Sequence, residues 1–145
     1  MRRLKQKRAN CQPKPRIRCA IYTRTATTQQ HCELAMSLAA QREAAETFIA
    51  KQHHRGWLCL PARYDDDGQS GVSLDRPGLQ RLLADIRGGK INHLVVYRLD
   101  RLTRSLSDCF ELLAIFKKHG TTLVSATEDL SRYPVLGLKQ VEVTV

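Results

Sequence analysis

A short arginine-rich segment, Arg98 to Arg104, has the residue types in this chain that are best suited to chemistry. It reads Arg-Leu-Asp-Arg-Leu-Thr-Arg and follows the apolar run His93 to Val96, which is typical of a buried strand. Guanidinium groups stay charged at neutral pH, and their forked N–H donors match the oxygens of a phosphate. The segment therefore predicts a site for a polyanion at the end of a strand. Taken alone, it fits an ordinary strand-to-helix connection equally well.

Three further motifs precede this segment. They are Tyr22-Thr23-Arg24-Thr25-Ala26-Thr27, Asp67-Gly68-Gln69-Ser70-Gly71 and Asp75-Arg76-Pro77-Gly78-Leu79. Together with Leu99 to Arg104 they resemble, in order and approximate spacing, the catalytic domain of the serine recombinases, which include resolvases, invertases and large phage-type integrases. The resemblance covers residues 17–129, which we expect to form the catalytic domain.

The resemblance implies a substrate, a reaction and a set of site residues. The family cleaves and exchanges DNA strands through a phosphoseryl–DNA intermediate, within dimers and tetramers, and needs no metal or cofactor. By resemblance the phosphate-binding residues are Arg24, Arg76, Arg101 and Arg104, with Asp100 as the active-site aspartate and Tyr22 and Ser70 in support. Arg98 has no firm family counterpart, and we expect it to make a flanking contact with the DNA backbone.

One position departs from the family pattern. The nucleophilic serine stands two residues after the first arginine, and here that residue is Ala26. Alanine has no oxygen to attack phosphorus, so we expect strand cleavage to be impaired. Thr27 is a poor substitute because a shift of one residue along an extended segment turns the side chain to the opposite face. The alternative is an inactive module that binds DNA or an intact recombinase.

Other chemistries are less well supported. A metal-dependent nuclease could use Asp65, Asp67 and Asp100. An EF-hand loop counted from Asp65 would need glutamate where Arg76 stands. The five cysteines have no CxxC pair, which favours reduced thiols, and no metal site is predicted.

Charge is unevenly distributed along the 145 residues. The formal net charge is +10, but eight of the basic residues lie within residues 2–18, where no acidic residue occurs, and the rest of the chain has sixteen basic against fourteen acidic residues. We expect residues 1–16 to form a flexible basic leader, with an auxiliary contact to DNA phosphates as the alternative. The sequence has no signal-like apolar segment and no run long enough to span a bilayer, so we expect a cytoplasmic protein.

Strand and helix patterns alternate through residues 17–129. Strands are predicted at 17–22, 57–64, 91–97 and 121–126, and helices at 37–53, 77–87 and 105–120. In the last helix Ser105 is the expected N-cap, and the expected inward side chains are Leu106, Cys109, Phe110, Leu113 and Phe116. This order predicts an α/β fold with a mostly parallel sheet of four to five strands and helices on both faces, and with ligands at the carboxyl ends of the strands.

The end of the chain does not fit the family pattern. The family continues into a long helix, whereas residues 130–145 contain Pro134 and Gly137 and end in alternating valines. We expect an atypical extended tail here. The chain could be a fragment, a deliberately disabled version or the product of a decayed gene.

Overall fold

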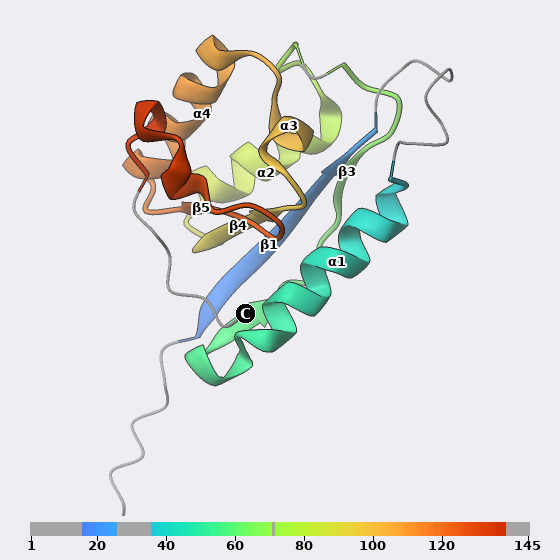
Figure 1. The fold of residues 1–145 in the computed structure, drawn as a ribbon, viewed down its shortest axis with the longest axis vertical. Helices are drawn as coiled ribbons and strands as arrows, with labels where there is room; N and C mark the ends of the chain where they lie inside the picture. The colour runs from blue at the N-terminus through green and yellow to red at the C-terminus, as the bar shows by residue number, and fades with distance from the viewer. Residues whose placement is uncertain (1–15, 26–35, 71, 139–145) are drawn as a thin grey trace, which may run out of the picture.

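The computed structural model describes residues 16–25, 36–70 and 72–138. They form one five-stranded sheet in which all pairings are parallel (Figure 1). The strands are β1 (Ile17–Arg24), β2 (Trp57–Cys59), β3 (Tyr64–Asp66), β4 (His93–Val96) and β5 (Thr122–Ser125). The order is β2-β1-β4-β5, and β3 pairs with the second half of β1. The predicted parallel α/β fold is therefore confirmed.

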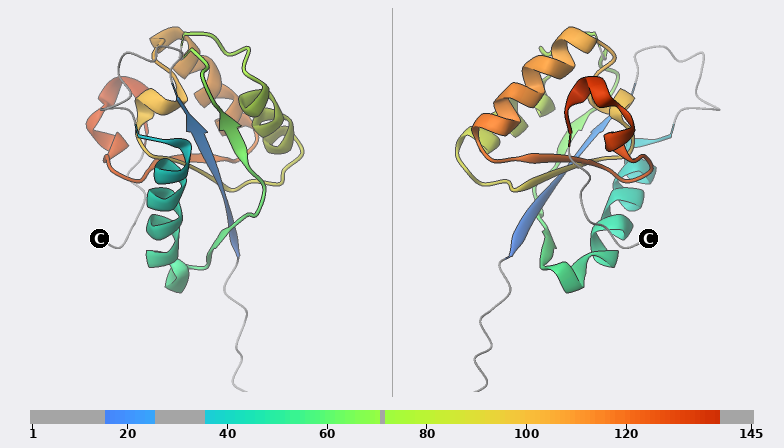
Figure 2. Two further views of the ribbon diagram at one scale, coloured as in Figure 1. Left: turned by 90° about the vertical axis from the view of Figure 1, so that its right-hand side faces the viewer. Right: turned by 60° about the vertical axis from the view of Figure 1, so that its left-hand side comes forward.

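Helices cover both faces of the sheet (Figures 1 and 2). The helix α1 (Leu38–Lys51) packs Ala45 and Ile49 against one face. On the other face lie α2 (Pro77–Arg87), α3 (Leu99–Leu102) and α4 (Leu106–Lys118). None of the described helices is long and apolar enough to cross a membrane.

Alternation along β1 decides which of its side chains reach the candidate site. Cys19 and Ile21 belong to the cluster under α1, whereas Ala20 and Tyr22 belong to the cluster under α2 and α4. Because side chains alternate along a strand, Tyr22 and Arg24 share a face of the sheet. That face carries α3, so the end of β1 directs its arginine toward the arginine-rich segment.

The predicted strand at 57–64 is wrong as a single strand. It forms two short strands, β2 and β3, which pair with different parts of β1. Pro61 lies in the connection, and proline has no N–H to donate to a sheet. The chain therefore leaves the ladder after Cys59 and rejoins it at Tyr64.

The inward face predicted for α4 needs a correction as well. Cys109, Leu112 and Phe116 are buried, whereas Leu106 is 58% exposed and Phe110 is 45% exposed. The buried residues follow i, i+3 and i+7 spacing, which one helix stripe can bury, and Leu106 and Phe110 lie outside that stripe.

The described part of the tail is not extended. It forms two single-turn 3₁₀ helices, η3 (Leu130–Arg132) and η4 (Pro134–Leu136), and Gly137 follows with a φ of 62°. The side chain of Asp129 accepts from the Ser131 amide and caps η3. Residues 1–15 of the predicted leader, the positions Ala26 and Thr27, and the valines after residue 138 lie outside the described residues.

Candidate active site

Arg24, the last residue of β1, is buried against the arginine-rich segment. Arg24 is only 1% exposed, and all three of its guanidinium nitrogens donate to main-chain carbonyls. Nε donates to Arg101 O at 3.1 Å, Nη1 to Gln69 O at 2.9 Å and Nη2 to Asp100 O at 2.6 Å. Arg24 thus ties the end of β1 to α3 and to the loop after β3.

Arg76, the N-cap residue of α2, is buried to the same extent. Its Nε donates to Ser73 O at 2.8 Å, its Nη2 to Leu102 O at 2.5 Å and its Nη1 to the Tyr22 hydroxyl at 2.7 Å. Its guanidinium carbon also lies 5.5 Å from the centre of the Tyr22 ring, within range of a cation–π contact.

Together the two arginines cap the carboxyl end of α3. The last carbonyls of a helix have no partner within it, and in α3 the carbonyls of Asp100, Arg101 and Leu102 accept from Arg24 or Arg76. Positive side chains are also favoured at this end of a helix. The two buried guanidinium groups therefore fix the segment that carries Asp100, Arg101 and Arg104.

A buried carboxylate completes the network. Asp66, the last residue of β3, is 3% exposed, and its Oδ2 accepts from the Tyr22 hydroxyl at 2.7 Å. The same carboxylate accepts from the first amides of α2, Gly78 N at 2.7 Å and Leu79 N at 2.9 Å. A carboxylate at a helix amino end is electrostatically favourable. A hydrogen-bonded path therefore runs from Arg76 through Tyr22 and Asp66 to the start of α2.

Gly78 is required by this close approach. A Cβ at residue 78 would lie 2.9 Å from Asp65 O, 2.9 Å from Asp66 Oδ1 and 3.0 Å from Asp66 Cγ. Only a residue without a side chain lets Asp66 reach both amides.

The electrostatics of the site show that the arginines lie close together. Burial lowers the pKa of Arg24, and the positive charges of Arg76, Arg104 and Arg101 lower that pKa further. Burial also raises the pKa of the Tyr22 hydroxyl, an effect opposed by Arg76 and reinforced by the hydrogen bond to Asp66. The structure thus brings the four predicted arginines into one cluster.

The solvent-facing part of the cluster comes from residues 98–104. Arg104 is exposed, and it makes no hydrogen bond or ion pair with the other described residues. Arg101 is half-buried, and its Nε has no hydrogen-bond partner within the described part of the chain. Arg98 lies 3.9 Å from Asp100 and 3.8 Å from Glu128 in two loose ion pairs. Arg101 and Arg104 are therefore the arginines best placed to meet a ligand.

The remaining predicted residues lie near the cluster without joining its hydrogen bonds. Ser70 is exposed, and its Oγ accepts from Val72 N at 3.2 Å in a local turn. Thr25, the residue before Ala26, hydrogen-bonds to Asp67 and to Gly68 N. The end of β1 and the loop after β3 therefore run side by side.

Two participants were not predicted from the sequence. Asp66 is absent from the predicted site residues, although its spacing from Tyr64 in a strand places both on one face. Gln41 is fully buried on α1 and bonds both main-chain groups of Arg24, accepting at 3.3 Å and donating at 3.0 Å. A glutamine on the buried side of a helix is a signal for such a contact.

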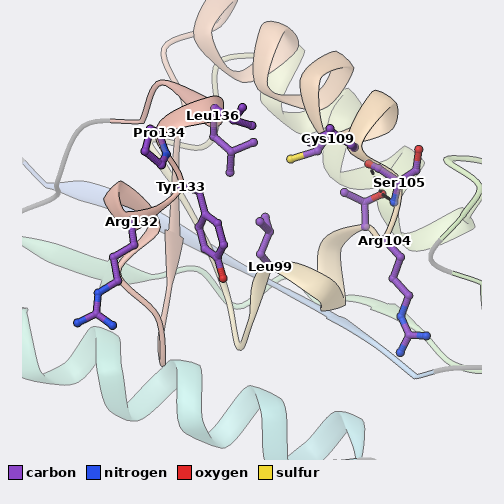
Figure 3. A pocket seen from close by; sticks show the side chains of 11 residues that line it. Leu99, Arg104, Ser105, Cys109, Arg132, Tyr133, Pro134 and Leu136 are labelled. Carbon is purple, nitrogen blue, oxygen red and sulfur yellow. Dashed lines mark hydrogen bonds between the residues drawn. The ribbon is translucent and has the colours of Figure 1, made fainter.

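No metal site emerges from the described side chains, because no three of their His, Cys, Asp and Glu residues are grouped to hold an ion. A pocket of about 320 Å³ lies beside the cluster, between α3, the start of α4 and the turns η3 and η4 (Figure 3). It is lined mainly by apolar groups such as Leu99, Tyr133 and Leu136. Arg104 is also a lining residue, but its guanidinium group points away from Leu99 and Tyr133 (Figure 3). The apolar lining makes this pocket a poor match for a phosphate.

Known proteins are similar to this chain in sequence and fold. The family described as "Resolvase, N terminal domain" matches residues 19–136. A resolvase of Escherichia coli is 31% identical over 113 residues, which are 77% of this chain and 45% of the relative. The serine recombinase Gin of Escherichia phage Mu is 35% identical over 72 residues, which are 50% of this chain and 36% of the relative. This chain thus matches less than half the length of either relative.

A solved structure has a similar fold. The crystal structure of the N-terminal catalytic domain of TP901-1 integrase superposes with a TM-score of 0.66 at 30% identity. The match covers 83% of this chain and 91% of that domain.

Proposed function

Because the chain belongs to the resolvase N-terminal domain family, we propose that it acts in site-specific DNA recombination, as a serine-recombinase catalytic domain that binds DNA and has lost its own strand cleavage. The observation that carries the proposal is the single cluster formed by Arg24, Arg76, Arg101 and Arg104 at the carboxyl ends of β1 and β4. With DNA as the partner, the location that we propose is the cytoplasm. Residues 17–129 are the proposed functional unit.

The roles within the cluster follow from exposure. Arg101 and Arg104 can donate to a phosphate, and guanidinium groups would stabilise the charge that develops on its oxygens during transfer. Asp100 stands beside them, 45% exposed, as the aspartate of the site. Arg24 and Arg76 hold α3 in place and add positive electrostatic potential from the buried side of the cluster. The missing part is the attacking hydroxyl, because the residue at the nucleophile position is Ala26.

DNA binding tests the arginine cluster. Fluorescence anisotropy with a 30-base-pair duplex would be measured for the full chain over a range of salt concentrations. A protein that loses two phosphate contacts should show a salt dependence, log K against log salt, that is flatter by about 2. We expect this result for Arg101→Ala/Arg104→Ala. The control Arg63→Ala/Arg81→Ala removes two exposed charges elsewhere and should keep the wild-type slope. Equal slopes for both variants would contradict the proposal.

Cleavage is tested separately. Supercoiled plasmids carrying the DNA that flanks the gene would be incubated with the protein and then treated with detergent to reveal covalent protein–DNA complexes. We expect none with the wild-type chain. A covalent complex that disappears in Thr27→Ala would show that Thr27 has taken over as the nucleophile, and the proposed loss of cleavage would be wrong.

Ala26 also favours a second candidate, a noncatalytic module that docks on an intact recombinase. Members of the family assemble as dimers and tetramers, and a chain that keeps the scaffold could enter such an assembly without cutting DNA. A pull-down with an intact homologue tests this candidate. Stable capture of the homologue by a chain that fails to bind DNA alone would favour docking over direct DNA binding.

A further inference from the structure

The amino end of the sheet carries a second concentration of positive charge, far from the candidate active site. In a parallel sheet each crossover helix runs back against the strands, so α1, α2 and α4 all end where the strands begin. We define the amino-end surface as Arg16, Arg18, Lys51, His53, His54, Arg55, Arg87, Lys90, Lys117, Lys118 and His119. The start of β1 and the turn η2 (His53–Arg55) lie at the opposite end of the molecule from α3 (Figure 2).

Hydrogen bonds connect the segments that make up this surface. Ile17 N donates to Gly56 O at 2.8 Å, which joins η2 to the start of β1. Arg18 Nη2 donates to Gly89 O at 2.8 Å, which joins β1 to the turn after α2. Asn92 N donates to Arg18 O, and Thr122 N donates to Asn92 O, each at 2.9 Å. The segments that carry these basic residues are therefore neighbours along the amino end, and we also call this surface the strip.

The strip is far more basic than the rest of the described chain. It contains eight Lys and Arg residues, and Asp85 is the one carboxylate in the described segments that form it. The remaining described residues have nine Lys and Arg against eleven Asp and Glu. The strip thus has a formal charge of +7 and the remaining described residues −2, so the excess positive charge of the described protein is at the end opposite the candidate active site.

Helix energetics explain only part of this pattern. Lys51, Arg87 and Lys117 stand in the last turns of their helices, where positive charge is favoured without any ligand. That effect does not account for Arg16, which is exposed and precedes a strand. Nor does it account for the scarcity of carboxylates. Lys90 pairs with Asp85 at 3.6 Å but is still 69% exposed.

From these observations we propose that the amino-end surface is a second DNA-binding surface, which holds the phosphate backbone of a duplex other than the one at the arginine cluster. A strip of exposed Lys and Arg is the footprint expected for sequence-independent backbone binding. The first fifteen residues of the sequence, which precede Arg16, contain six Lys and Arg and no carboxylate. A membrane surface fits less well, because surface helices that bind lipid expose a large apolar face. Among the described residues, Leu58 is the one large exposed hydrophobic residue close to this end.

The test uses the full chain and three charge-neutralising changes at exposed positions of the strip, Arg16→Ala/Lys117→Ala/Lys118→Ala. The matched control, Arg63→Ala/Arg81→Ala/Arg132→Ala, removes three exposed charges elsewhere. Anisotropy with a 30-base-pair duplex should show a salt dependence flatter by about 2 to 3 for the first variant, since each lost phosphate contact removes about 0.9 from the slope. The control should keep the wild-type slope.

A second measurement asks whether one molecule holds two duplexes. Energy transfer between two differently labelled duplexes should rise when wild-type protein is added, and it should be lost both in the amino-end variant and in Arg101→Ala/Arg104→Ala. The inference is overturned if the amino-end variant binds and bridges DNA like its control, or if its loss of binding is confined to RNA or to anionic vesicles. A different result separates the two proposals. If bridging is lost in the amino-end variant but unaffected in Arg101→Ala/Arg104→Ala, the proposed function is overturned, whereas the second DNA-binding surface is supported.

Discussion

Replacing Gly78 by alanine tests whether the close contact between Asp66 and the start of α2 supports the candidate site. The new Cβ would lie 2.9 Å from the Asp65 carbonyl and 2.9 Å from Asp66 Oδ1. The first of these atoms belongs to the backbone, and the second is held by its bond to the Gly78 amide. Either α2 or the carboxylate must move, and movement weakens the bonds from Asp66 to Tyr22 and to the helix.

The expected magnitude combines three effects. Overpacking in a well-packed interior costs about 1 to 3 kcal/mol. Loss of one hydrogen bond to a charged group costs about 1.5 to 3 kcal/mol. Alanine offsets about 1 kcal/mol of this because it is a better helix former than glycine. The free energy of unfolding should therefore fall by about 2 to 5 kcal/mol.

Urea unfolding followed by tryptophan fluorescence is a suitable assay, because the chain has one tryptophan, Trp57, which is 4% exposed. The midpoint should fall by about 1 to 2 M urea. Gly88→Ala is the matched control, since its Cβ would meet atoms no closer than 3.5 Å and its φ of −75° suits alanine. The control should be neutral or slightly stabilising. A midpoint for Gly78→Ala at or above the wild-type value would refute the reasoning.

Three other substitutions probe the same network and one helix end. Tyr22→Phe removes the hydroxyl between Arg76 and Asp66 and should cost about 1 to 3 kcal/mol in urea unfolding. Because burial raises the pKa of Tyr22, the folded state favours the neutral phenol, so wild-type stability should decline as pH rises above about 10, and less steeply in Tyr22→Phe. Arg24→Lys leaves at least two of the three carbonyls bonded by Arg24 without that donor. Calorimetry should show that the free energy of unfolding falls by about 2 to 4 kcal/mol. A change near zero would mean that water replaces the guanidinium group. Ser105→Ala removes the N-cap acceptor for the Asp108 amide and should cost about 1 kcal/mol, with α4 otherwise intact by circular dichroism.

Local signals were sufficient to predict the helices that position the site. The helix α2 has the predicted bounds because Pro77 opens it and the pair Gly88-Gly89 follows it, with apolar residues spaced for one face between them. Ser105 caps α4 as expected. The division of residues 57–64 into β2 and β3 was not predictable in this way, because it depends on which part of β1 each piece meets.

The site itself was only partly predictable. The sequence motifs identified the arginines that come together, but they gave no indication that Arg24 and Arg76 are 1% exposed and donate to the carbonyls of α3. Whether an arginine side chain faces solvent or a helix end depends on residues that are distant in the sequence. The partners of Arg24 on α3 are Asp100 and Arg101, which are more than fifty positions away. The exposed positions of Leu106 and Phe110 depend likewise on which of several apolar stripes of α4 reaches the sheet.

The hydrogen bonds from Arg24 and Arg76 to the carbonyls of α3 have a consequence for the evolution of such sequences. Under the proposed function, a chain without its nucleophile is released from selection for cleavage, yet it cannot lose Arg24 or Arg76 without leaving the carbonyls of Asp100, Arg101 and Leu102 unpaired in the interior. These arginines should therefore persist in inactive descendants simply because the protein must fold. In a genome survey their presence would identify the scaffold, whereas the residue at the position of Ala26 would be the better indicator of a working enzyme.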